Sequence, residues 1–141
     1  MTLYAETSAV LHWLFGEADA LALLDHLRAA NKVVASRLTW IETHRVIRRA
    51  EREQRIGDAE VAELLAIFAR AAAHWAVLEL TRDVAERAVE GFPVEPVRTL
   101  DAIHLASVLF LRRSLPDLAL LSTDERVRRN AARLGISLLP A

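Results

Sequence analysis

Four acidic residues stand where carboxylates could act together: Glu6, Glu42, Asp101 and Asp124. Glu6 directly follows a short apolar run, Asp124 follows the run LALLST, and Glu42 lies early in a helical pattern that follows a second apolar run. Ligands of an open parallel sheet bind beyond the carboxyl ends of its strands, so we expect these acids at one rim. Carboxylates gathered there would repel one another strongly without a cation, and the pattern therefore predicts a divalent-metal site.

Each acid taken alone also has a structural explanation. Asp101 lies in the apolar stretch TLDAIHLASVLFL, where an unpaired carboxylate is costly, but an acid in the first turn of a helix is stabilised there. Thr39 and Glu42 have the spacing of a capping box, in which the glutamate bonds back to the backbone. Glu6 and Asp124 are placed where each could cap a helix. Both interpretations remain open for all four acids.

The predicted metal is a hard cation, because the chain contains no cysteine and the acids offer only oxygen ligands. Oxygen ligation suits Mg²⁺ or Mn²⁺, the ions used in phosphoryl chemistry. Such an ion polarises a phosphodiester and lowers the pKa of its bound water, which supplies a nucleophile without a serine or a histidine. The acids therefore point to metal-dependent hydrolysis of a phosphodiester.

The strands and helices that must position these acids are indicated by the sequence pattern. Short apolar runs alternate with longer helical patterns, as in βαβ units around a parallel sheet. We predict an α/β fold, a three-layer α/β/α sandwich with a central, mostly parallel sheet, formed by residues 1–141 as one domain. The expected strands are 3–5, 33–35, 75–80, 118–121 and 136–139, and the expected helices are 9–15, 17–30, 36–55, 58–74, 81–90, 99–113 and 124–134.

Composition restricts the class of protein further. The formal net charge is −1, so contact with nucleic acid would need a local basic patch. The chain has one lysine, Lys32, among 18 basic residues, and the other 17 are arginines, whose planar fork suits phosphate and carboxylate partners. No apolar run approaches the roughly 18 residues of a membrane span. We expect a cytoplasmic protein with no membrane contact.

Four blocks of the sequence resemble those of a known family: YAETSAVL at 4–11, SRLTWIETHRVI at 36–47, RTLDAIHLASVL at 98–109 and LLSTDERVRRNAARLGI at 120–136. Their order and spacing are similar to the PIN domain family and, within it, to the VapC-like toxins of type II toxin–antitoxin pairs. The resemblance implies a PIN-like fold and an endoribonuclease that depends on Mg²⁺ or Mn²⁺, held by the acids of these blocks. It also implies a homodimer and a cognate antitoxin protein that inserts residues into the acidic site.

The first acid departs from the family pattern, because it is usually an aspartate and here it is Glu6, longer by a methylene. Mg²⁺ demands ligand distances near about 2.0–2.1 Å, so a longer arm moves the ion, favours Mn²⁺ or weakens the enzyme. The alternative to a ribonuclease is thus a weakly active or inactive PIN-like module that binds RNA or protein.

Hydroxyl and basic side chains near the acids form the remaining candidates. Three hydroxyls could hold a metal-bound water or a phosphate, or could instead cap helices: Thr7, Ser8 and Thr123. A basic stripe with spacings of three and four could follow an RNA backbone, meet an acidic partner or form a solvated helix face: Arg45, Arg48, Arg49 and Arg52. His104, one turn after Asp101, is interpreted as structural, and the three tryptophans are predicted to lie in the core.

Overall fold

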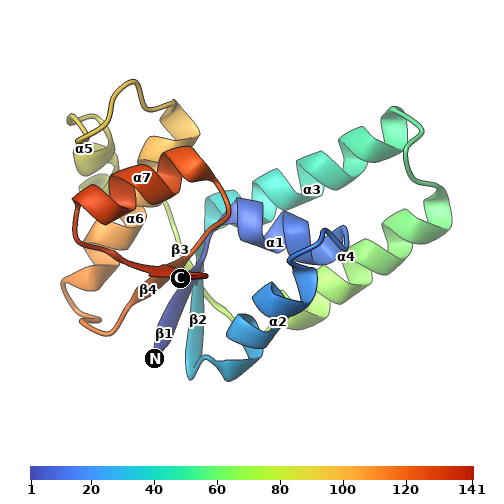
Figure 1. Ribbon diagram of the computed structural model, residues 1–141. Coiled ribbons are helices and arrows are strands. Elements are labelled where there is room, and N and C mark those ends of the chain that lie inside the picture. Colours follow the sequence, from blue (N-terminus) through green and yellow to red (C-terminus); the bar gives the residue numbers. More distant parts are fainter.

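A five-stranded, entirely parallel sheet forms the centre of the computed structural model, which describes residues 1–141 (Figure 1). The strand order is β3-β2-β1-β4-β5. The strands are β1 (Thr2–Ala5), β2 (Lys32–Ser36), β3 (Ala76–Leu78), β4 (Ala119–Leu121) and β5 (Ser137–Leu139). The predicted α/β class and parallel sheet are confirmed, and each strand overlaps its predicted range.

Seven helices connect or follow these strands. They are α1 (Thr7–Leu14), α2 (Ala20–Ala29), α3 (Arg37–Arg52), α4 (Asp58–Ala72), α5 (Arg82–Ala88), α6 (Thr99–Arg112) and α7 (Glu125–Arg133). Each overlaps a predicted helix, and the ends differ by a few residues, as is usual for helix termini. None of the seven is long and apolar enough to cross a membrane.

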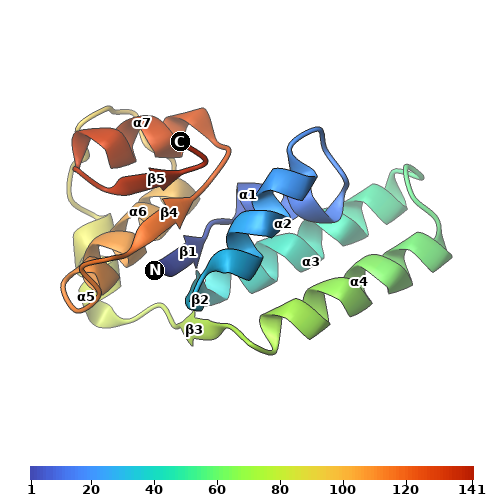
Figure 2. The same cartoon turned by 60° about the horizontal axis from the view of Figure 1, so that its bottom comes forward.

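The helices form two layers, one on each face of the sheet, because side chains of a strand alternate between its faces. In β1, Leu3 and Ala5 join a buried cluster with residues of α1 to α4, whereas Tyr4 joins a second cluster with residues of α6 and α7. Figures 1 and 2 show α1 to α4 on one side of the sheet and α5 to α7 on the other. The three-layer α/β/α sandwich is therefore confirmed.

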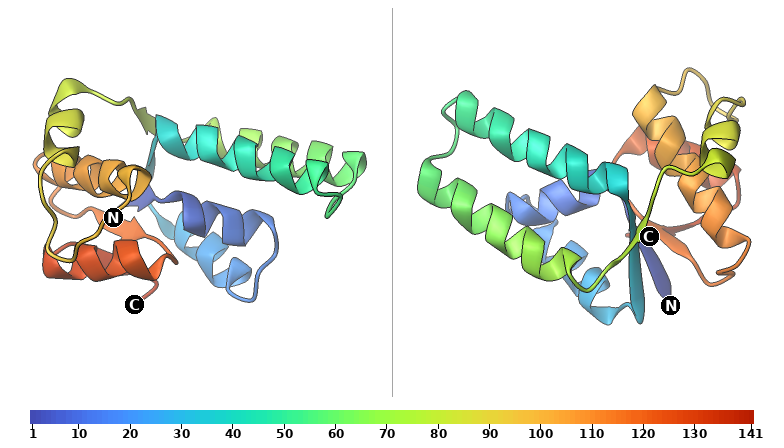
Figure 3. Two further views of the ribbon diagram at one scale, coloured as in Figure 1. Left: turned by 90° about the horizontal axis from the view of Figure 1, so that it is seen from above. Right: turned by 180° about the vertical axis from the view of Figure 1, so that it is seen from behind.

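A long helical hairpin, α3 and α4, extends away from the sheet (Figure 3). The side chain of Ser36 caps α3 by accepting a hydrogen bond from the backbone N–H of Leu38 at 3.0 Å. Gly57 precedes α4 and lies in the gap between the two predicted helices 36–55 and 58–74. The hairpin places the first turn of α3 at the sheet and its arginine-rich end away from it.

The strand order sets the position of the candidate site. The chain runs outward from β1 through β2 to β3 and then crosses back to β4 on the other side of β1. Connections therefore diverge from the carboxyl ends of β1 and β4, which is the place where open α/β sheets bind ligands. Glu6 continues the pairing of these strands, since its N–H donates to the carbonyl oxygen of Leu121 at 3.0 Å.

Candidate active site

Glu6 lies at this point of divergence and is only 4% exposed. Its Oε2 accepts hydrogen bonds from the hydroxyls of Ser8 and of Ser122, the latter at 2.8 Å. The residue begins α1, but its side chain makes no capping hydrogen bond, so the helix-cap explanation for Glu6 is wrong. The buried carboxylate of Glu6 is thus held by one hydroxyl from the first turn of α1 and one from the residue that follows β4.

His104, in the second turn of α6, is the centre of the hydrogen-bond network and is 1% exposed. Its Nε2 donates to Oε1 of Glu42 at 2.8 Å and lies 3.9 Å from Oε1 of Glu6. Its Nδ1 is hydrogen-bonded to the buried hydroxyl of Tyr4 at 2.8 Å. Thr7 donates from its hydroxyl to the same oxygen of Glu42 at 2.7 Å. The imidazole thus joins β1, α1, α3 and α6.

The protonation of this network follows from its contacts. Burial lowers the pKa of His104, but its hydrogen bond to Glu42 and the charges of Glu6, Glu42 and Asp101 outweigh burial and raise this pKa above its usual value. Burial raises the pKa of Glu42, and the hydrogen bonds and charge from His104 and Thr7 more than reverse this, so its pKa is lowered. Both shifts favour an imidazolium beside a carboxylate.

Glu42 is not part of a capping box. Ser36 caps α3 instead, while Thr39 lies inside the helix and donates its hydroxyl to the carbonyl oxygen of Ala5 at 3.3 Å. The sequence pattern is misleading because α3 begins three residues earlier, so Glu42 lies in its second turn, where it cannot bond back to the cap, and it is hydrogen-bonded to His104 instead. The structural explanation for Glu42 is wrong, and the side chain faces the candidate site.

Asp101 and Asp124 lie close enough for the charge of one to affect the other. Burial and the charge of Asp124 raise the pKa of Asp101, although Arg98 and His104 act in the opposite sense. Arg98 donates from Nε to Oδ2 of Asp101 at 3.4 Å. Asp124 does cap α7, since its Oδ1 accepts from the N–H of Arg126 at 2.8 Å and of Val127 at 3.2 Å. Its other oxygen, Oδ2, makes no hydrogen bond within the protein.

The donor chemistry suits a hard cation, but the side chains as they lie do not form a finished metal site. The four carboxylates come from the ends of β1 and β4, from the second turn of α3 and from the first turn of α6. No three histidine, aspartate or glutamate side chains are grouped so that they could hold one ion together. Hydroxyls engage Oε2 of Glu6, and Thr7 and His104 engage Oε1 of Glu42, which leaves one oxygen of each carboxylate without a hydrogen bond.

A cleft of about 510 Å³ adjoins the acids between α3 and α6. Glu42 and Asp101 lie in its wall together with Arg45, Arg49 and Arg98. Two of the four predicted arginines of α3 therefore face the cleft, whereas Arg48 pairs with Glu51 at 3.3 Å and Arg52 is exposed further along the helix. A cleft lined by guanidinium groups as well as by carboxylates has the charge to bind an anionic polymer.

The predicted supporting hydroxyls divide into two groups. Thr7 and Ser8 face the acids rather than cap a helix, and Ser8 also accepts from the N–H of Thr123 at 3.0 Å. The hydroxyl of Thr123 makes no hydrogen bond, and Asp124 is the cap of α7, so capping by Thr123 is wrong. Trp40 is 47% exposed and stacks on His44 with ring centroids 4.3 Å apart, which corrects its prediction as core.

Three network residues were not predicted as part of the site: Tyr4, His104 and Ser122. His104 has a sequence signal, since it lies one turn after Asp101 on the same helix, but its true hydrogen-bond partner is Glu42, from a different segment. Ser122 follows the last residue of β4 and could have been found by reading strand ends for hydroxyls as well as for acids. Tyr4 has no signal, because an aromatic residue inside a strand normally belongs to the core.

Comparison with known proteins agrees with this geometry. The family model described as PIN domain matches residues 3–133. "Ribonuclease VapC46" of Mycobacterium tuberculosis is 32% identical over 139 residues, which is 97% of this chain and 95% of that protein.

Two solved structures share the fold. VapBC2 from Rickettsia felis, bound to a DNA fragment from its promoter, aligns with a TM-score of 0.65 and 10% identity over 98% of this chain and 97% of that one. A toxin-antitoxin complex from Klebsiella pneumoniae aligns with a TM-score of 0.62 and 20% identity over 94% and 91%. The family model, the relative and the acids at the carboxyl edge of the sheet together show that this chain belongs to the PIN domain family.

Proposed function

We propose that this protein is a VapC-type ribonuclease, an endonuclease that cleaves RNA with Mg²⁺ or Mn²⁺, and that it acts as the toxin of a toxin–antitoxin pair. One observation carries the proposal: Glu42 and Asp101 lie in one arginine-lined cleft at the divergence point of the sheet. The 32% identical relative is named a ribonuclease, which supports RNA as the substrate.

Under this proposal the four acids hold the metal ion. Asp101 and Asp124 are the readiest ligands, since one oxygen of Asp124 is free and Asp101 has only a long contact with Arg98. Glu6 and Glu42 complete the set, since each keeps one carboxylate oxygen that makes no hydrogen bond. A bound Mg²⁺ or Mn²⁺ supplies charge neutralisation at the phosphodiester and an activated water.

The chain's own residues position the RNA and orient the carboxylates. Arg45 and Arg49 follow one another by one helical turn along the cleft wall, the spacing at which guanidinium groups reach successive parts of a polyanion. His104 is a positioning residue, because it holds Glu42 toward the cleft and contacts Glu6 without facing the cleft itself. The hydroxyls of Thr7 and Ser8 fix the rotamers of Glu42 and Glu6, respectively.

The replacement of the family's first aspartate by Glu6 does not abolish the site under this proposal. The longer arm of Glu6 reaches the hydroxyl of Ser122 at the end of β4, so the extra methylene is accommodated within the protein. The rival interpretation, a binding module without turnover, predicts that Glu6→Asp creates activity that the native chain lacks.

The proposed partners are RNA, a cognate antitoxin and a second copy of the chain. The antitoxin rests on family membership and on a structural relative described as a toxin-antitoxin complex. The homodimer has a suitable apolar surface, a hollow of about 360 Å³ between α5 and α6, beside the exposed side chains of Leu80 and Val89. Sedimentation of the isolated chain tests the dimer directly.

The decisive experiment removes one charge from the cleft. Asp101→Asn is expected to lower the rate of RNA cleavage in Mg²⁺ or Mn²⁺ by at least about 100-fold, since a metal ligand is lost. The matched control is Asp83→Asn, an exposed aspartate of α5 that makes no hydrogen bond, which should leave the rate unchanged. Equal rates for native chain and Asp101→Asn would refute the proposed chemistry.

A further inference from the structure

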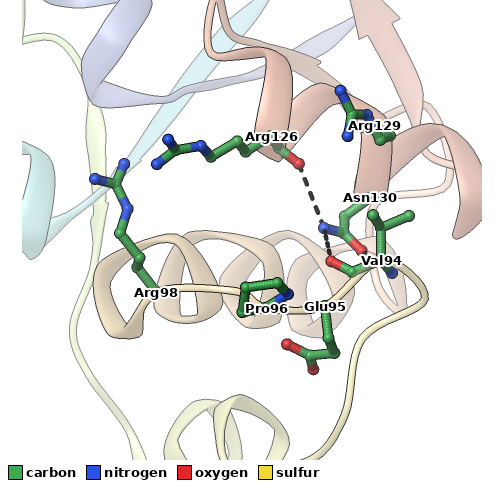
Figure 4. Close-up of a pocket in the computed structure, with 7 residues that line it drawn as sticks. All are labelled: Val94, Glu95, Pro96, Arg98, Arg126, Arg129 and Asn130. Carbon is green, nitrogen blue, oxygen red and sulfur yellow. Dashed lines mark hydrogen bonds between the residues drawn. The ribbon is translucent and has the colours of Figure 1, made fainter.

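A second pocket, of about 380 Å³, lies next to the active-site cleft, and we call it the arginine pocket (Figure 4). It is formed between the loop that precedes α6 and the outer side of α7. Its lining residues are Val94, Glu95, Pro96, Arg98, Arg126, Arg129 and Asn130. Arg98 also lines the active-site cleft, so the two hollows adjoin at this side chain.

The loop side of the arginine pocket is held in place by its own polar groups. Asn130 of α7 accepts from the N–H of Val94 at 2.8 Å and donates to its carbonyl oxygen at 3.0 Å. Glu95 accepts from the N–H groups of Phe92 at 2.8 Å and Val97 at 2.7 Å. The only carboxylate of the pocket is thus committed to the backbone, and it pairs with none of the arginines.

The arginines of the pocket lack partners of their own. The side chains of Arg126 and Arg129 make no hydrogen bond and no ion pair, and Arg98 makes one contact of 3.4 Å with Asp101. Figure 4 shows Arg98 and Arg126 extending from different elements toward the same space, whereas Arg129 points elsewhere. Two guanidinium groups facing one space repel each other, and an anion between them removes that repulsion.

The chemistry of the lining favours a phosphate over other anions that a protein partner would bring. Val94 is the pocket's one hydrophobic lining residue, so an apolar side chain of a docking peptide would find little to contact. Guanidinium forks bind phosphate oxygens in pairs with good geometry. An RNA strand lying in the neighbouring cleft carries a phosphate at every nucleotide, and its next stretch must pass Arg98.

We propose that Arg98 and Arg126 form a subsite for a backbone phosphate of the RNA strand beside the phosphodiester that is cleaved. RNA as the ligand rests on the proposed function, but the subsite concerns binding and not the chemical step. Its strand contacts run from Arg45 and Arg49 in the cleft, past Arg98, to Arg126 in the arginine pocket.

The test uses Arg126→Gln, because Arg126 contacts Asp124 only through its backbone N–H, which the substitution keeps, and its side chain pairs with no acid of the active site. Arg133→Gln is the matched control: it removes the same charge from an exposed, unpaired arginine of α7 that lies outside the pocket. Two probes are used, a fluorescent single-stranded RNA of about 12 nucleotides and a dinucleotide. The longer probe has a length that proteins of this kind commonly cover on a single strand. Binding is measured in EDTA, so that no metal-dependent cleavage occurs, and thermal unfolding confirms that each variant is folded.

We expect Arg126→Gln to weaken binding of the longer RNA by about 10-fold, the low end for a hydrogen bond to a charged group, and to leave dinucleotide binding unchanged. The slope of log K against log salt should fall by about 0.7, the value for one lost phosphate contact on a single strand. Arg133→Gln should change neither quantity appreciably. Equal losses in the two variants, or no binding of the longer RNA by the native chain, would overturn the subsite.

Failure of the subsite is distinguishable from failure of the proposed function. If Asp101→Asn abolishes cleavage while Arg126→Gln binds RNA normally, the nuclease stands and the subsite falls. A third measurement uses polyglutamate as a competitor. Two results together would refute the RNA subsite. Polyglutamate would displace the longer RNA from the native chain at equal charge concentration, and Arg126→Gln would lower the affinity for polyglutamate and the affinity for RNA equally. The pocket would then be a site for an acidic protein segment.

Discussion

Replacement of His104 by alanine tests whether this buried imidazole, and not a bound cation alone, keeps the acids together. The change removes a hydrogen bond to a charged partner, which contributes about 1.5–3 kcal/mol, since Nε2 of His104 lies 2.8 Å from Oε1 of Glu42. It also takes a partner at 2.8 Å from the buried Tyr4 hydroxyl and leaves a cavity at a side chain that is 1% exposed. We expect a total loss of about 3–5 kcal/mol.

The assay is urea unfolding in EDTA at about pH 6, where the imidazole is charged and no metal contributes. His104→Gln separates the parts of this loss, because the glutamine amide can still donate to Glu42, and it should recover about half of the stability. His74→Ala is the matched control at an exposed histidine with no hydrogen bond, and it should change stability by less than about 0.5 kcal/mol. A loss below about 1 kcal/mol for His104→Ala would refute the structural role assigned to the imidazole.

Three further predictions concern pH, the first acid and the C-terminal strand. Because the pKa of His104 is raised, this residue adds stability below its usual pKa of 6.5, and the contribution is lost at higher pH. Because the pKa of Glu42 is lowered, this residue adds stability above its usual pKa of 4.5, and the contribution is lost at lower pH. The difference in the free energy of unfolding between the native chain and His104→Gln should therefore peak between pH 4.5 and pH 6.5. Glu6→Asp should change cleavage by less than about 10-fold and shift the preference between Mg²⁺ and Mn²⁺, as paired cleavage assays in each metal will show. Arg128 donates to carbonyl oxygens of Ser122 and Pro140 at 2.8 and 2.7 Å, so Arg128→Ala should cost about 2–3 kcal/mol in thermal unfolding, and an unchanged midpoint would exclude this contribution.

The fold could be predicted because its signals are local. The short run at β1, the glycine before α4 and the apolar spacing of α6 each indicate an element within a few residues of its true bounds. The rim on which Glu6 and Asp124 lie also follows, since both come directly after strands and all strands are parallel. Chain order and strand direction were enough to place these two acids at the same edge of the sheet.

The contacts of the site could not be predicted, because they depend on which face of each helix packs against its neighbours. Ser36 and Thr39 could each have been the cap of α3, and neither possibility indicates that Glu42 is hydrogen-bonded to His104 of α6. The partner of His104 was missed for the same reason, since it comes from a residue 62 positions away. Such pairings are set by packing between elements, which spacing within one segment does not record.

The network around His104 changes the argument for a cation. Repulsion among four carboxylates suggested that only a metal ion could hold them together, yet an imidazole with a raised pKa and hydroxyls from Thr7, Ser8 and Ser122 already compensate Glu6 and Glu42 in the protein alone. Asp101 has only its long contact with Arg98, Asp124 accepts only from backbone N–H groups, and burial together with the charge of Asp124 raises the pKa of Asp101. Ion binding should therefore begin at these two aspartates. Since the imidazolium of His104 repels an incoming cation, His104→Gln should bind Mn²⁺ more tightly than the native chain, whereas weaker binding would mean that the imidazole prepares the site for the ion.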